Sequence, residues 1–199
     1  MSVQLTVQKK KVKNKRRVAW GITGCGDLIS ETIEVMKGIK QKYEDKVEIR
    51  VYLSKAGEQV IKYYKLVGDL EKNFSRLQVE MDSNSPFLAG ALQLGKFEFL
   101  LIAPTTSNTV AKISLGIADT LLSNAAIMAL KAYVPVYILT SDYKERIILT
   151  KLPSGQQLKL KIRKEDVANV KKLEKIGNVH VFEKLEDINQ LFKNYFQAT

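Results

Sequence analysis

Signals for β-strands and α-helices alternate along most of this chain, and this alternation limits its possible folds more than any other feature. Short apolar or alternating segments, typical of strands, occur at residues 17–22, 47–53, 97–103 and 134–140. Helical spacing of apolar residues occurs at residues 28–43, 54–67 and 109–132, with an interruption near residues 116–119. Strand–helix–strand order favours a parallel sheet covered on both faces, so we expect a doubly wound, mostly parallel, Rossmann-like α/β fold.

A β-hairpin is expected after the last of these strands. Residues 146–151 and 157–163 resemble strands, and the sequence Leu152-Pro153-Ser154-Gly155 lies between them. Proline fixes its own φ angle and glycine tolerates a positive one, so this tetrapeptide favours a tight reversal of the chain. We therefore predict a C-terminal hairpin extension of the sheet, an arm over residues 143–164.

The remainder of the C-terminal quarter continues the same domain. It contains a predicted helix at 166–176, a strand at 179–182 and a closing helix at 185–195. Because no low-complexity linker precedes this region, we expect residues 17–199 to form a single domain behind a basic tail of residues 1–16.

The formal net charge of +11 is unevenly distributed along the chain. Residues 1–17 hold seven basic side chains and no acidic one, residues 18–142 have a net charge of −1, and residues 143–199 have a net charge of +5. We expect the tail to be a solvated arm. The basic last quarter favours an acidic protein partner, and we do not expect nucleic acid to be the partner.

Cysteine, histidine and long apolar segments are too scarce for several classes of protein. The single cysteine, Cys25, excludes a disulfide framework, a cysteine-ligated zinc site and a self-contained iron–sulfur cluster. The single histidine, His180, lies in a strand-like segment where a structural role is expected, so we expect no metal site. The chain shows no apolar run of membrane-spanning length and no secretory leader, so a cytoplasmic protein without a membrane anchor is expected.

Residues able to bind a ligand follow the first two predicted strands. The turn Gly21-Ile22-Thr23-Gly24-Cys25-Gly26-Asp27 has glycines that let backbone amides approach an anion, and Thr23 adds a hydroxyl. Its spacing matches neither the dinucleotide fingerprint nor the Gly-Lys-Ser/Thr sequence of an NTPase; it suits one phosphate, although a tight turn is the simpler explanation. Asp27 and Ser54 are expected to cap the helices that follow them, and Ser54 would also reach the same phosphate.

The most specific segment of the chain follows the strand at residues 97–103. It reads Ala103-Pro104-Thr105-Thr106-Ser107-Asn108-Thr109, and Pro104 is expected to end the strand. Helix capping needs one of the five successive hydroxyl and amide side chains. The others suit the lining of a flat ligand whose carbonyl groups and ring nitrogens need hydrogen-bond partners.

The segment APTTSNTVAKISLGIADTLLSNA resembles the signature of the flavoprotein superfamily of homo-oligomeric flavin-containing cysteine decarboxylases, close to Ala-Pro-x-(Thr/Ser)-Ala-Asn-Thr. GITGCGDL, VPVYILTSD and IRKEDVANVKKLEKIGNVHVFEKLEDI further resemble its archaeal flavoprotein branch, which includes ferredoxin-linked and dihydromethanopterin reductase-like proteins. The resemblance spans roughly residues 17–190. It implies a Rossmann-like fold, bound FMN and a trimer-based homo-oligomer, with the flavin ring near a subunit interface.

The resemblance also implies which residues bind the cofactor. The phosphate would be held by Thr23, Gly24, Cys25 and Ser54. The isoalloxazine ring and ribityl chain would face Ala103, Pro104, Thr105, Thr106, Ser107, Asn108 and Thr109. No catalytic residue is assigned. Lys112 and Asp119 also match motif positions, but a solvated helix charge and the cap of a helix beginning at Thr120 are the simpler explanations.

Residues required by the decarboxylase members of this superfamily are absent. No histidine precedes His180, and residues 134–142 contain no methionine or tryptophan that would form a substrate clamp. The prenyl-phosphate site of the prenyltransferase branch has no match either. The leading hypothesis is an FMN-dependent oxidoreductase that transfers electrons between a ferredoxin-like acidic carrier and an unidentified acceptor. The alternatives are a flavin-dependent transferase or lyase on the same scaffold, and a module whose basic tail binds nucleic acid.

Several other side chains have simpler structural explanations. Trp20 is expected in the core, Cys25 is expected to fit its turn as a small side chain, and Tyr63, Tyr64 and Tyr133 are expected to pack against the body. The basic run on the hairpin is either a solvated edge or a dock for an acidic electron carrier. Its members are Lys159, Lys161, Arg163 and Lys164.

Overall fold

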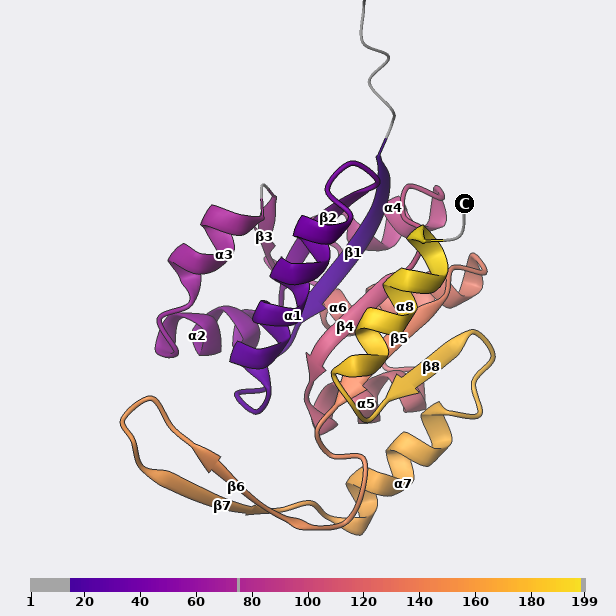
Figure 1. Cartoon of the computed structure of the whole chain (residues 1–199). Coiled ribbons are helices and arrows are strands. Elements are labelled where there is room, and N and C mark those ends of the chain that lie inside the picture. Colours follow the sequence, from indigo (N-terminus) through magenta and orange to yellow (C-terminus); the bar gives the residue numbers. More distant parts are fainter. Residues whose placement is uncertain (1–14, 75, 198–199) are drawn as a thin grey trace, which may run out of the picture.

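Apolar segments bounded by turn residues become the strands of one parallel sheet. The computed structural model describes residues 15–74 and 76–197, and its sheet is shown in Figure 1. The strands are β1 (Arg16–Ile22), β2 (Val47–Leu53), β3 (Leu77–Val79), β4 (Leu100–Thr105), β5 (Val136–Thr140) and β8 (Val179–Phe182). Their order is β3-β2-β1-β4-β5-β8 with every adjacent pair parallel, which confirms the doubly wound α/β class.

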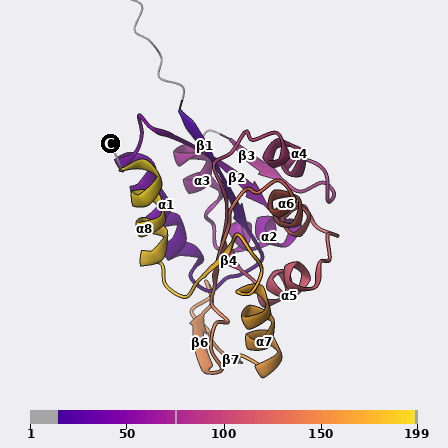
Figure 2. The ribbon, with the colours of Figure 1, turned by 90° about the vertical axis from the view of Figure 1, so that its right-hand side faces the viewer.

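Amphipathic helices cover both faces of the sheet, and Figure 2 shows α1 and α8 on one side and α4, α5 and α6 on the other. The first group of helices comprises α1 (Ile29–Lys42), α2 (Lys55–Tyr63), α3 (Val67–Asn73) and α8 (Glu186–Phe196). The second group comprises α4 (Leu88–Gln93), α5 (Ser107–Leu115), α6 (Leu121–Lys131) and α7 (Lys164–Leu173). Each group buries its apolar residues against one face of the sheet, so the domain has two core layers.

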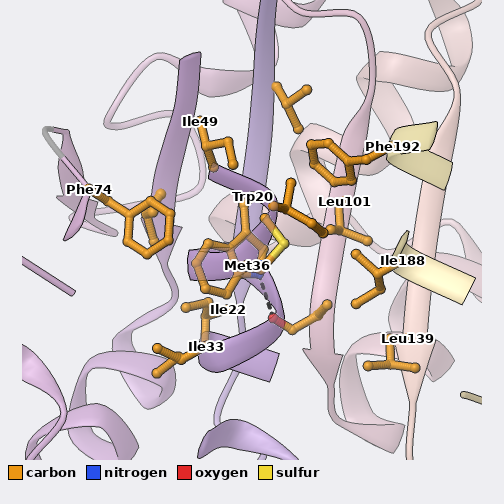
Figure 3. Close-up of a cluster of buried hydrophobic side chains, with 14 of the residues drawn as sticks. Trp20, Ile22, Ile33, Met36, Ile49, Phe74, Leu101, Leu139, Ile188 and Phe192 are labelled. Carbon is orange, nitrogen blue, oxygen red and sulfur yellow. Dashed lines mark hydrogen bonds between the residues drawn. The ribbon is translucent and has the colours of Figure 1, made fainter. Parts of the chain in front are cut away.

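Trp20 lies in the core layer under α1, as predicted (Figure 3). Its side chain is fully buried, and its ring meets that of Phe74 edge to face with centroids 5.3 Å apart. The indole N–H donates a hydrogen bond of 2.7 Å to the carbonyl oxygen of Ala103. This bond ties β1 to the adjacent strand β4 close to the carboxyl ends of both.

The predicted C-terminal β-hairpin is present, and it forms a two-stranded sheet of its own. Strands β6 (Ile147–Lys151) and β7 (Gln157–Lys161) pair antiparallel, and Gly155 in the turn has a φ of 86°. The Ile162 amide donates to the Arg146 carbonyl oxygen at 2.9 Å where the two arms leave the body. Figure 1 shows the hairpin passing below the carboxyl ends of the parallel strands and beneath α2.

Two predicted boundaries were wrong for reasons of backbone geometry. Pro104 does not end its strand, because β4 begins at Leu100 and continues to Thr105, with a shift in pairing register between Ile102 and Thr105. A ladder that shifts at this point accommodates a residue without an amide hydrogen. The expected helix over residues 54–67 ends at Tyr63, and a second helix, α3, follows.

The cap prediction holds for α2 and fails for α1. The Ser54 hydroxyl accepts a hydrogen bond from the Gly57 amide at 2.9 Å, as an N-cap does. Leu28, with a φ of 61°, is the N-cap residue of α1, and no side chain bonds there, so Asp27 does not cap this helix. α3, β3 and α4 are further elements that the sequence analysis does not predict.

Two expectations remain, one on the N-terminal basic tail and one on membrane-spanning helices. β1 already begins at Arg16, inside the range predicted for the basic tail, whereas residues 1–14 lie outside the described residues. Within residues 15–74 and 76–197, no helix is both long and apolar enough to cross a membrane.

Candidate functional site

The order of the parallel strands reverses between β1 and β4, where open α/β sheets form a crevice at their carboxyl ends. Two adjoining cavities occupy this position, and both are lined by Gly24 and Thr106. The first, the switch cavity, has a volume of about 310 Å³ and lies between the starts of α2, α5 and α6. The second, the hairpin cavity, has a volume of about 350 Å³ and lies under the inner face of the hairpin.

Thr23 connects the two turns that frame the crevice. Its amide and its hydroxyl both donate to the Pro104 carbonyl oxygen, at 3.3 and 2.9 Å. The same hydroxyl accepts a hydrogen bond from the Thr106 amide at 2.9 Å. Because the Thr23 side chain is 2% exposed and already bonded twice, it holds the turn after β1 against the turn after β4.

Two helices begin at the switch cavity, and some of the amides in their first turns have no acceptor in the protein. Ser54 and Thr106 cap α2 and α5, and both residues line the cavity. Within the described ranges, no protein group accepts a hydrogen bond from the amides of Gly24, Ala56, Ser107 and Asn108. Unpaired amides at helix starts, together with the helix dipoles, form a binding site for a phosphate.

Glycine is required where the turn after β1 meets α2. A Cβ atom at Gly24 would lie 2.8 Å from the Cβ of Ala56, and one at Gly57 would lie 2.4 Å from the carbonyl oxygen of Ile22. Both distances are shorter than van der Waals contact allows for a Cβ atom. The close approach brings the first amides of α2 to the crevice.

Glu80 is a site residue that the sequence analysis missed. Its carboxylate is buried at the edge of the switch cavity and accepts hydrogen bonds from the first amides of two helices. One oxygen accepts from the Lys55 amide and the other from the Leu121 amide, both at 3.0 Å. Glu80 therefore joins the starts of α2 and α6. An acidic residue directly after a strand was the available signal, but three-residue β3 was too short to recognise.

Lys112 lies at the switch cavity, where its ammonium group forms an ion pair with Asp119 at 2.8 Å. Hydrogen bonding to Lys112 lowers the pKa of Asp119. The prediction that Asp119 caps a helix was wrong, because Thr120 is the N-cap residue and α6 begins at Leu121. Lys112 is more than a solvated helix charge, since its side chain is 21% exposed and lines the cavity.

The predicted cofactor residues fall into three groups in the structure. Those that line the switch cavity are Thr23, Gly24, Ser54, Thr106, Asn108 and Thr109. Cys25 and Ser107 line the hairpin cavity, together with Gly24 and Thr106. Ala103, Pro104 and Thr105 are buried in β4, and the Thr105 hydroxyl donates to the Ile102 carbonyl oxygen at 2.7 Å. The structure therefore brings eight of the eleven residues to the two cavities.

The hairpin cavity has an apolar roof and a polar floor. Its roof is formed by the hairpin residues Ile148, Thr150, Leu152, Leu158 and Leu160, and its side by Val60, Tyr63 and Tyr64 of α2 and the residue after it. Tyr63 is 53% exposed and Tyr133 is 85% exposed, so the prediction that these tyrosines pack against the body was wrong. In addition to Gly24, Thr106 and Ser107, the floor contains Cys25, Gly26, Asp27, Ser141 and Asp142.

Burial controls the ionisation of two groups on this floor. It raises the pKa of the Cys25 thiol to about 11, and the thiol donates a weak hydrogen bond to the Asp27 carbonyl oxygen at 3.4 Å. Burial, with the negative charges of Glu31 and Asp142, also raises the pKa of the Asp27 carboxyl group. At neutral pH Cys25 is therefore a protonated thiol, which is a poor nucleophile.

The described residues contain no group of three His, Cys, Asp or Glu side chains arranged to hold a metal ion. His180 is exposed on β8, and its ring stacks on that of Tyr137 with centroids 4.8 Å apart.

Comparison with known proteins gives a family and several relatives. The sequence model described as "Flavoprotein" matches residues 6–191. An uncharacterised protein of Methanocaldococcus jannaschii is 45% identical over 182 residues, which are 92% of this chain and 97% of the relative. A protein of the same organism named dihydromethanopterin reductase (acceptor) is 42% identical over 145 residues, which are 69% of this chain and 58% of the relative.

Solved structures share the fold over nearly the whole chain. DmrB of Burkholderia xenovorans, crystallised with FMN and described as a cubic protein cage for redox transfer, has a TM-score of 0.78 and 28% identity. The match covers 93% of this chain and 97% of DmrB. FMN-dependent decarboxylases are below 25% identical, and their likeness shows the fold alone.

Proposed function

The chain belongs to the Flavoprotein family, and we propose that it binds FMN at the switch cavity and acts as an FMN-dependent oxidoreductase. The observation that carries this proposal is the convergence of the starts of α2 and α5 on a glycine turn at the point where strand order reverses. The named reductase of M. jannaschii and the FMN-bound cage protein support it. The chain spans 58% of the length of the named reductase from M. jannaschii, so that protein's activity enters here as a proposal.

The residues of the switch cavity fit the phosphate end of FMN. The amides of Gly24, Ala56 and Asn108 supply donors, and Lys112 supplies positive charge. Thr23 would act by holding the two turns together, and Ser54 by capping α2 and offering its hydroxyl hydrogen. Asn108 and Thr109 would serve the ribityl chain, while Ala103, Pro104 and Thr105 would form the packed support beneath. When bound, FMN supplies the redox chemistry and the protein supplies its orientation.

Comparing FMN with riboflavin tests this proposal, because riboflavin lacks the phosphate. The absorption spectrum and mass spectrum of the purified full chain identify any flavin that it carries. After removal of this flavin, we expect FMN to bind about 100-fold more tightly than riboflavin, as two charge-assisted hydrogen bonds would give. A colourless chain that binds neither flavin would refute the proposal.

A pair of glycine variants tests the position of the phosphate. Gly24→Ala should weaken FMN binding about tenfold, because the new methyl group would displace the start of α2 and with it the Ala56 amide. Gly38→Ala is the matched control, since a Cβ atom there has no neighbour within 4 Å. Equal FMN affinities in the two variants would place the phosphate elsewhere.

We propose a ferredoxin-like acidic protein as the electron donor or acceptor that faces the hairpin. Exposed Lys159, Lys161 and Lys164 offer positive charge on β7 and at the start of α7. Arg163 is also exposed but pairs with Asp166 at 2.6 Å, so three of the four predicted cations are free for a partner in this part of the structure. Such steering weakens as salt screens it. Reduction by ferredoxin should therefore slow as ionic strength rises, and charge reversal at Lys159 and Lys161 should remove most of this salt dependence.

The transferase or lyase alternative makes a different prediction about electron supply. It requires turnover of an organic substrate beside the flavin with no electron donor present, whereas the proposed oxidoreductase requires a donor. Nothing in the two cavities favours the alternative over the oxidoreductase. Product formation by the FMN-loaded chain under anaerobic conditions without reductant would favour it.

We propose a homo-oligomer built from trimers, in which Ile147 and Leu149 pack against a neighbouring subunit and leave Lys159 and Lys161, on the same face of the hairpin, accessible at the edge of that contact. Ile147 is 59% exposed and Leu149 is 68% exposed, and an isolated two-stranded hairpin has little stability in water. Light scattering of the purified chain should give a multiple of three subunits. The doubly charged variant Ile147→Asp with Leu149→Asp should lower that number.

A further inference from the structure

A third helix, α6, begins at the switch cavity beside α2 and α5. The N-cap residues of the three helices are Ser54, Thr106 and Thr120, and all of them line the cavity. Each cap hydroxyl accepts a hydrogen bond from the third amide of its own helix, which leaves the first two amides for other partners. Because every helix start carries partial positive charge, this cavity offers places for more than one anionic group.

Glu80 already fills one of these places with its own negative charge. As described above, its two carboxylate oxygens accept hydrogen bonds from the first amide of α2, at Lys55, and from the first amide of α6, at Leu121. Glu80 is 8% exposed, and within the described ranges no lysine, arginine or histidine nitrogen lies within 4.0 Å of its carboxylate. The two helix starts therefore compensate this buried charge, as they would compensate a bound anion.

The position assigned to the FMN phosphate lies next to this carboxylate. In the first turn of α2, the Lys55 amide donates to Glu80, whereas the amide of the following residue, Ala56, has no acceptor in the described part of the protein. A phosphate bound by the Ala56 amide is thus within one helical turn of a fixed negative charge. A second phosphate directed towards α6 would find the Lys55 and Leu121 amides occupied, and it would be repelled by the carboxylate that occupies them.

We infer that Glu80 determines the cofactor specificity of the switch cavity: its carboxylate occupies the place of a second phosphate and restricts the cavity to flavins that carry one. The inference rests on the proposed function, since it concerns which flavin the cavity accepts. It gives Glu80 a role beyond joining α2 to α6. A residue that only joined the two helices would affect flavins with one phosphate and with two phosphates alike.

Two flavins that differ by one phosphate group test this inference. FMN carries a single phosphate, and riboflavin 5′-diphosphate carries a second one without the adenosine of FAD. After removal of any bound flavin, we expect the full chain to bind FMN at least about 30-fold more tightly than the diphosphate, because of the repulsion by Glu80. FAD should be rejected at least as strongly. Quenching of flavin fluorescence gives the dissociation constants.

A pair of variants assigns this preference to the charge of Glu80. Glu80→Gln keeps the length of the side chain and removes its charge, so the diphosphate should bind within about threefold of FMN, even where FMN itself binds less tightly than to the native chain. Glu58→Gln is the matched control. It also removes a carboxylate from the first turn of α2, but Glu58 pairs with Lys62 and does not line the cavity, so the native preference should remain.

Distinct results separate failure of this inference from failure of the proposed function. The comparison of FMN with riboflavin tests the phosphate site itself. Where FMN is preferred to riboflavin, equal binding of FMN and the diphosphate by the native chain would overturn the inference and leave the FMN proposal intact. A preference for FMN that is unchanged in Glu80→Gln, or equally reduced in Glu58→Gln, would do the same.

A measurement on the native chain covers the case in which thermal melting shows Glu80→Gln to be unfolded. Orthophosphate and pyrophosphate are each added as competitors of FMN. Although pyrophosphate carries more charge, it should compete no better than orthophosphate, because Glu80 occupies the place of its second phosphate group. Stronger competition by pyrophosphate would overturn the inference.

Discussion

The two cavities lie side by side but are built from different parts of the polypeptide. The switch cavity depends on backbone groups: free amides at the starts of α2 and α5, and a glycine turn close to α2. The hairpin cavity depends on side chains, with leucines above and carboxylates below. The first should therefore tolerate many changes of side chain and few changes of backbone. The second should show the opposite pattern.

The supports of the two cavities differ in the same way. Thr23, Thr105 and Glu80 beside the switch cavity are buried and hydrogen-bonded to strands or helix starts that belong to the main sheet. The hairpin pairs with itself and exposes every residue of β7. The positions of the groups around the switch cavity are thus fixed by folding of the whole domain. The roof of the hairpin cavity depends on the pairing of the hairpin alone.

The largest expected effect comes from adding one methyl group to the backbone-built cavity. Gly57→Ala should reduce the free energy of unfolding by about 3 kcal/mol, because its Cβ would meet a backbone oxygen that cannot move without shifting β1. Gly38→Ala in α1 should instead raise stability by about 0.5–1 kcal/mol. Urea unfolding of both variants measures the difference, and similar midpoints would contradict this account.

A change in pH tests the thiol at the boundary between the cavities. Burial raises the pKa of Cys25 to about 11 from an ordinary 9.0. At pH 7.5 the thiolate fraction, and with it the rate of alkylation by iodoacetamide, should be about 100-fold below that of an ordinary thiol, and the rate should rise about tenfold per pH unit. Because the unfolded thiol ionises first, stability should fall as pH rises above 9. Fast alkylation at pH 7.5 would show that the turn opens.

The switch cavity should tolerate most changes of side chain, but Glu80 is an exception. Its carboxylate, and not a backbone group, accepts the hydrogen bonds of two helix-start amides. Glu80→Gln keeps one acceptor oxygen for two amides, so it should cost about 2 kcal/mol of stability and weaken FMN more than riboflavin. Glu58→Gln, which removes an exposed pair with Lys62, should cost less than about 0.5 kcal/mol. Calorimetry and flavin titration of both variants provide the comparison. Equal costs would mean that Glu80 does not join the two helices.

The smallest effect on stability is expected at the roof. Leu160→Ala should change the free energy of unfolding by less than about 1 kcal/mol, because the side chain is already 43% exposed. Ile147→Ala, on the opposite face of the hairpin, should have an effect of similar size. Thermal melting of both variants measures these changes. A large loss of stability in Leu160→Ala would mean that the hairpin is part of the core.

Long periodic segments were the predictable part of the fold. The strand at Val47–Leu53, the strand at Val179–Phe182 and the hairpin follow the sequence pattern closely, because alternating side chains and a Pro-Ser-Gly turn determine them locally. The break between α5 and α6 was also predicted, and Gly116 ends α5 there with a φ of 75°. The resemblance assigns both the turn after β1 and the polar segment after β4 to one flavin, and Thr23 joins the two segments in the structure.

What the sequence did not reveal depends on tertiary contacts. β3 is three residues long and pairs only with β2, so its pattern is too short to recognise, and Glu80 was missed with it. Thr105 belongs to a polar segment that was predicted to face the flavin. In the structure it is the last residue of β4, and its buried hydroxyl donates to the Ile102 carbonyl oxygen. Tyr64 packs against the core as predicted. The exposure of Tyr63 could not be predicted, because the cavity beside it is formed by a hairpin far along the chain.

The hydrogen bond between Ile162 and Arg146 closes the base of the hairpin, so both of its arms leave the domain at one place. Lengthening, shortening or rewriting everything beyond that closure leaves the register of the six parallel strands untouched. The hairpin can thus change during evolution without displacing the residues of the switch cavity. Relatives of this chain would then differ in what the hairpin cavity binds while sharing the way in which they bind the flavin.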